Sequence, residues 1–72
     1  MNPQPTNRAQ EHLEILLEHY RSGRLNDAEK LASSITRETP LNEVAWKALW
    51  AILQKIGKTK ESLTAIQKAE QI

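Results

Sequence analysis

The stretch Gly23-Arg24-Leu25-Asn26-Asp27-Ala28-Glu29 decides the fold, because a second version of it, Gly57-Lys58-Thr59-Lys60-Glu61-Ser62-Leu63, follows 34 residues later. Each version opens with one of the two glycines of the chain and has a small residue, alanine or serine, five positions on. A period of 34 residues is typical of helical repeats whose unit is a helix-turn-helix pair. The sequence therefore predicts an all-α protein built from two antiparallel helix pairs.

The repeat also predicts how the chain is organised. Residues 1–6 hold two of the three prolines and no periodic apolar residues, so they are expected to form a disordered lead-in. A single small domain is expected over residues 7–72. Its first unit covers about residues 9–42 and its second about residues 43–72.

Capping residues predict where each helix begins and ends. The predicted N-caps are Asn7, Asn42 and Thr59. Gly23 and Gly57 are expected to end the first and third helices, since glycine readily takes the left-handed conformation that terminates a helix. The second helix is expected to begin at Leu25 or Asn26 and to end at Thr39, because the residue before a proline avoids helical angles.

Apolar residues recur at helical spacing, and none alternate with the period of a strand. The third helix is apolar almost all round, so it is predicted to be the most buried element. The apolar set predicted to face inward on the fourth helix is Leu63, Ala65, Ile66, Ala69 and Ile72.

This pattern resembles the tetratricopeptide repeat, whose first helix carries W-x-x-L-G-x-x-Y and whose second carries small and large apolar residues before a proline. The matching residues of unit two are Trp46, Leu49, Leu53, Ser62, Ile66 and Ala69, and those of unit one are Ile15, Ala28, Ala32 and Pro40, with His12 and His19 in the aromatic places. The resemblance implies a short right-handed α-solenoid that binds proteins. It also implies that the chain is an N-terminal fragment of a larger protein.

The sequence departs from the family at the glycine of the first helix. Leu16 and Trp50 occupy that place. Each helix pair is therefore expected either to open slightly or to bury these side chains against another element. Trp46, by contrast, is predicted to be a core residue.

Composition argues against several classes of partner. The chain has 72 residues, no cysteine and a formal net charge of +1, with acids and bases interspersed. Nucleic acid and membrane are therefore not expected partners, and no apolar run is long enough to span a bilayer. No signal-peptide pattern opens the sequence, so a cytoplasmic location is expected.

The groove side of the first helices is predicted to bind a protein or peptide partner. In unit one, Leu13, Leu17 and Tyr20 form an apolar strip that the helix pair does not need for its own core, a feature suited to an amphipathic or extended peptide. The full set of predicted partner-binding residues is Leu13, Leu17, Tyr20, Arg21, Lys47, Ala51, Gln54 and Lys55.

The chain is also predicted to self-associate as a homodimer. Helical repeats bury their apolar faces against neighbours, and about three units are usually needed for stability. Only two are present here. The residues predicted to meet a second copy are Trp50, Leu63, Ile66 and Ile72.

Catalytic and metal-binding patterns are weak. His12 and His19 are seven residues apart, whereas helical metal pairs sit three or four apart. Glu11, Glu14 and Glu18 are expected to form a solvated acidic edge. No serine has a histidine at usable spacing, and neither glycine belongs to a phosphate-binding loop. No cofactor, metal or enzyme activity is predicted.

Two alternatives remain at this point. A helix-turn-helix DNA reader is disfavoured, because the second helix opens with Asn26-Asp27-Ala28-Glu29, whose acids repel phosphate. The second alternative follows from the resemblance: the repeats form a non-catalytic N-terminal segment of a bacterial enzyme, such as a glycosyltransferase-like or sulfotransferase-like protein.

Overall fold

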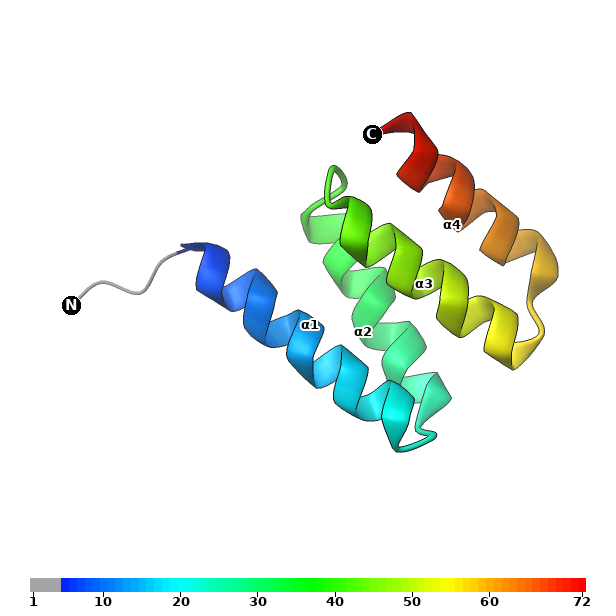
Figure 1. Cartoon of the computed structure of the whole chain (residues 1–72), viewed down its shortest axis with the longest axis horizontal. Coiled ribbons are helices and arrows are strands. Elements are labelled where there is room, and N and C mark those ends of the chain that lie inside the picture. Colours follow the sequence, from blue (N-terminus) through cyan, green and yellow to red (C-terminus); the bar gives the residue numbers. More distant parts are fainter. Residues whose placement is uncertain (1–4) are drawn as a thin grey trace.

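Four helices follow one another along the chain in the computed structural model, which describes residues 5–72 and the side chains of residues 11–72. They are α1 (Pro5–Arg21), α2 (Leu25–Glu38), α3 (Glu43–Ile56) and α4 (Thr59–Gln71). No strand occurs between residues 5 and 72, so the predicted all-α class is confirmed. Helices α1 and α4 lie at opposite edges, with α2 and α3 between them (Figure 1).

Helix α1 begins earlier than the sequence predicted. Pro5 and Thr6, assigned to the lead-in, are its first residues, and the predicted cap Asn7 lies inside it. Proline suits the first turn of a helix because its missing N–H would have no intrahelical partner there. The rest of the predicted lead-in, residues 1–4, lies outside the described residues.

The two glycine turns share one hydrogen-bond arrangement, 34 residues apart. Gly23 and Gly57 both have positive φ, +79° and +100°. The N–H of the following residue donates to the carbonyl five residues back at 2.9 Å in both turns, Arg24 to His19 and Lys58 to Leu53. This bond closes a Schellman turn. The sequence repeat is therefore a structural repeat, and both predicted helix ends are confirmed.

Of the two other predicted N-caps, one is confirmed and one is wrong. The Asn42 side chain accepts a hydrogen bond from the Ala45 N–H at 3.2 Å, as expected of the N-cap of α3. Thr59, predicted to cap α4, is instead its first helical residue, and its N-cap position is taken by Lys58 without a side-chain hydrogen bond. Helix α2 ends at Glu38, just before Thr39, as predicted.

Small residues let the helices approach closely. Ala28 and Ala32 of α2, Ala45 of α3 and Ser62 of α4 are fully buried. Ala28 and Ser62 are equivalent in the repeat, and so are Ile35 and Ala69, which are also buried. Two buried positions therefore recur in the second helix of each unit. Helix α3 packs against both α2 and α4, although Val44 at its start is exposed.

Two large side chains differ in how they use the space between units. Leu16 stands where the tetratricopeptide pattern has glycine, and it is only 1% exposed. It is therefore buried, which is one of the two predicted outcomes. Trp46 is half-buried rather than a full core residue, because it sits near the start of α3 beside the α2–α3 turn. Its ring packs on the core cluster, and its Nε1 donates to the Pro40 carbonyl at 2.8 Å.

The paired turns generate a stability prediction. Gly23→Ala and Gly57→Ala should each lower the free energy of unfolding by roughly 1–2 kcal/mol, the cost of left-handed backbone for a residue with a Cβ. A Cβ at either site meets nothing within 4 Å, so the two losses should be equal within about 0.5 kcal/mol. Urea unfolding followed by circular dichroism measures both. Clearly unequal losses would contradict the structural equivalence of the turns, with the exposed Ser22→Ala as the neutral control.

Trp46 gives a second prediction. Trp46→Phe removes the bond to Pro40 and should lower the free energy of unfolding by about 0.5–1.5 kcal/mol. Trp46→Ala should cost more, yet less than the roughly 3–5 kcal/mol of a fully buried aromatic residue. Trp50→Phe is the matched control, since no hydrogen bond to the Trp50 indole is found among residues 11–72. Equal losses for Trp46→Phe and Trp50→Phe would show that the Pro40 bond contributes nothing.

Candidate functional site

A small apolar groove lies between the first helices of the two units. It encloses about 110 Å³. The residues that line this α1–α3 groove are Leu16, Leu17, Tyr20, Ala48, Ala51 and Ile52. Leu17 and Ala51 are equivalent positions of the repeat, so each unit contributes the same point of its first helix to one groove.

The groove has a buried floor and a more open wall. Leu16 and Ile52 form the floor, each 1% exposed. Leu17 on the wall is 47% exposed, and Tyr20 is half-buried with its ring packed on the core cluster. Leu17 is half in water beside a buried apolar floor. Covering such a side chain with another apolar group lowers the free energy. The groove therefore offers a place for one such group.

The groove gathers only part of the predicted partner-binding set. Leu17, Tyr20 and Ala51 line it, whereas Leu13 packs against the core cluster one turn away and does not line it. The remaining four predicted residues, Arg21, Lys47, Gln54 and Lys55, are exposed and outside the lining.

Sequence reasoning missed three lining residues: Leu16, Ala48 and Ile52. Leu16 and Ile52 carried a signal, since each is next to a predicted binding residue in the chain. Neither is in the predicted set, although a buried residue can also form the floor of a site. Ala48 is absent from the predicted set because a small residue marks a groove only when its neighbours are known.

Two cations stand at the same end of the groove. Arg21 and Lys55 are equivalent in the repeat, and both lie in the last turn of their helices. Helices α1 and α3 run in the same direction (Figure 1), so these last turns border one end. Lys47 is less available, since its Nζ is 3.0 Å from a Glu43 carboxylate oxygen. Within residues 11–72, neither Arg21 nor Lys55 forms an ion pair.

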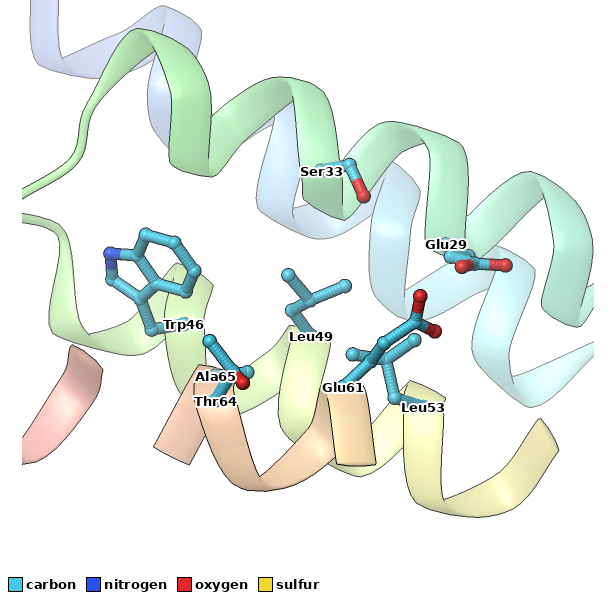
Figure 2. Close-up of a pocket in the computed structure, with 8 residues that line it drawn as sticks. All are labelled: Glu29, Ser33, Trp46, Leu49, Leu53, Glu61, Thr64 and Ala65. Carbon is cyan, nitrogen blue, oxygen red and sulfur yellow. The ribbon is translucent and has the colours of Figure 1, made fainter. Parts of the chain in front are cut away.

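A second hollow, of about 260 Å³, lies between α2, α3 and α4. Figure 2 shows the Trp46 ring at one end, Leu49 in the middle, and the Glu29 and Glu61 carboxylates at the other end. The Lys58 Nζ is 2.9 Å from a Glu29 carboxylate oxygen. That hydrogen bond, with the negative charges of Glu29 and Glu61, raises the pKa of Lys58. The Lys58–Glu29 pair ties the α3–α4 turn to α2, so these charged groups have a structural role.

The two histidines line neither the α1–α3 groove nor the second hollow. His12 and His19 line a shallow hollow between α1 and α2 that also holds Asp27 and Lys30. The His19 Nδ1 is buried and has no hydrogen-bond partner in the described part of the chain. No group of three histidine, cysteine, aspartate or glutamate residues with metal-site geometry occurs among residues 11–72. Ser33 and Thr64 line the second hollow, where neither histidine lies.

No helix within residues 5–72 combines the length and apolarity needed to cross a membrane. Comparison of the chain with protein-family models, with curated proteins and with solved structures gives no match.

Proposed function

We propose that this chain is a non-enzymatic protein-interaction module of the tetratricopeptide type, which binds a partner segment in the α1–α3 groove. The observation that carries the proposal is the half-exposed Leu17 beside a floor of buried Leu16 and Ile52. Apolar grooves between helices of this kind accept an apolar anchor from a helix or an extended peptide.

The size of the groove supports a peptide side chain as its occupant and argues against a cofactor. About 110 Å³ is well below the roughly 300–1,000 Å³ of sites that enclose small-molecule ligands or cofactors. It has room for one apolar side chain. A peptide that inserts one anchor and continues along α1 and α3 fits such a groove better than a cofactor does.

The charges around the groove indicate the chemistry of the partner. Arg21 and Lys55 border one end, and the residues that line the groove carry no charge. A partner segment with acidic residues to one side of its apolar anchor would meet both cations. Such rim charges chiefly set orientation and association rate, while the anchor supplies most of the affinity.

The test is a peptide-display selection on the parent protein, followed by titration of the enriched peptides. Selected peptides should share a large apolar residue followed or preceded by acids. Leu17→Glu should weaken their binding at least about tenfold, as loss of a central anchor contact does. Arg21→Glu should weaken it less and should reduce its salt dependence.

The matched control is Leu41→Glu, which makes the same chemical change at a leucine that is 78% exposed in the α2–α3 turn, outside the groove. It should leave affinity unchanged. Circular dichroism should show both variants folded, because both leucines are substantially exposed. Peptides that bind the parent and Leu17→Glu equally well would contradict the proposed site.

A further inference from the structure

The two edges of the helix stack differ: the α4 edge is apolar and the α1 edge is acidic. Comparing equivalent positions of the repeat shows this difference. Residues 9–38 of unit one each have an equivalent 34 positions later in unit two. A residue of unit one that is covered by α3 therefore has an equivalent at the outer edge of unit two. No described helix covers that edge as α3 covers unit one. Helix α4 packs on α3 and forms that edge (Figure 1).

The outer edge of unit two retains the apolar character of the covered positions. Leu16 and Ala32 in unit one are 1% and 0% exposed. Their equivalents, Trp50 and Ile66, are only half-buried. Leu63, predicted to face inward, lies on the same edge and is 53% exposed. Ile72, predicted to meet a second copy, follows nine residues later, about half a turn around α4, and is not part of this edge. We call Trp50, Leu63 and Ile66 the α4 face. Covering this surface would be favourable, since removing large apolar groups from water lowers the free energy.

The opposite edge is closed by acids. Ala45 and Ile52 of α3 are buried in the core cluster, and Ala48 lines the α1–α3 groove. Their equivalents on α1 are Glu11, Glu14 and Glu18, all exposed. A second copy that stacked its α1 on the α4 face would have to bury these carboxylates where α3 places alanine and isoleucine. The cost of burying unpaired charge opposes that arrangement. Head-to-tail stacking of copies is therefore blocked.

We propose that the α4 face binds the α4 face of a second copy about a two-fold axis, with the two α4 helices antiparallel. Lys60 in the first turn of α4 and Glu70 in its last turn border the face; both are exposed, and neither is ion-paired within residues 11–72. Antiparallel helices bring each Lys60 to the Glu70 of the other copy. Parallel helices would set like charges together.

This geometry closes at two copies. A two-fold contact uses the same surface on both partners, so no free α4 face remains to add a third. None of the residues that line the α1–α3 groove belongs to the α4 face, so both grooves stay open. The dimer and the peptide site are therefore separate proposals that can fail independently.

Sedimentation equilibrium of the full chain tests the contact. The average mass of the parent should rise with concentration to that of a dimer and should not exceed it. Leu63→Glu should raise the dimer dissociation constant at least about tenfold, while Leu41→Glu, an equal change at an exposed leucine away from the face, should not alter it. A parent that stays monomeric to millimolar concentration, or that grows beyond a dimer, would overturn the proposal.

Charge reversal tests the orientation. Lys60→Glu and Glu70→Lys should each weaken the dimer, because each places two pairs of like charges across the contact. The double variant restores opposite charges at both places and should recover the parent's dissociation constant within about twofold, in low salt where surface pairs are least screened. Additive weakening in the double variant would reject the antiparallel arrangement.

Discussion

Close approach of the helices is the constraint on which the rest of the structure depends. Helices α2 and α4 lie against their partners because Ala28, Ala32, Ser62 and Ala65 leave no side chain in the way. Because α2 packs against both α1 and α3, these two helices border one groove. A large residue at one of these small positions would overpack the contact and displace the walls of the groove along with the core.

Much of the fold could be predicted because its signals are local. Glycine at a left-handed turn, asparagine at an N-cap and threonine before proline each act over a few residues, and the repeat duplicates the turn signals. The errors arose where two local signals competed. Proline marked the lead-in but also suits a first helical turn, so α1 begins at Pro5. Threonine is a good cap, yet at Thr59 the helix starts one residue earlier in its hydrogen bonding, with Ser62 N–H donating to the Lys58 carbonyl.

The site was harder to predict, because it depends on which neighbour covers each residue. Leu13, Leu17 and Tyr20 have the same apolar pattern on α1, but only the last two line the groove. Periodicity gives the direction of a side chain around its own helix. It does not give the position of the facing helix. The same reason explains Ile15, which takes a core leucine's place in the repeat pattern yet is exposed, since it borders the open hollow between α1 and α2 and not the core.

The unlike edges follow from the same repeat and limit how the protein can assemble. A repeat whose units were identical would offer complementary faces at both ends, and such a contact propagates into filaments. Here the positions equivalent to Ala45, Ala48 and Ile52 carry glutamates on α1, so covering that edge with the apolar α4 face would bury unpaired carboxylates. If the α4 face pairs with itself, each dimer holds two α1–α3 grooves on one rigid body. A partner with two anchor segments would then bind both grooves with an effective concentration set by its linker, and its avidity would exceed that of either groove alone.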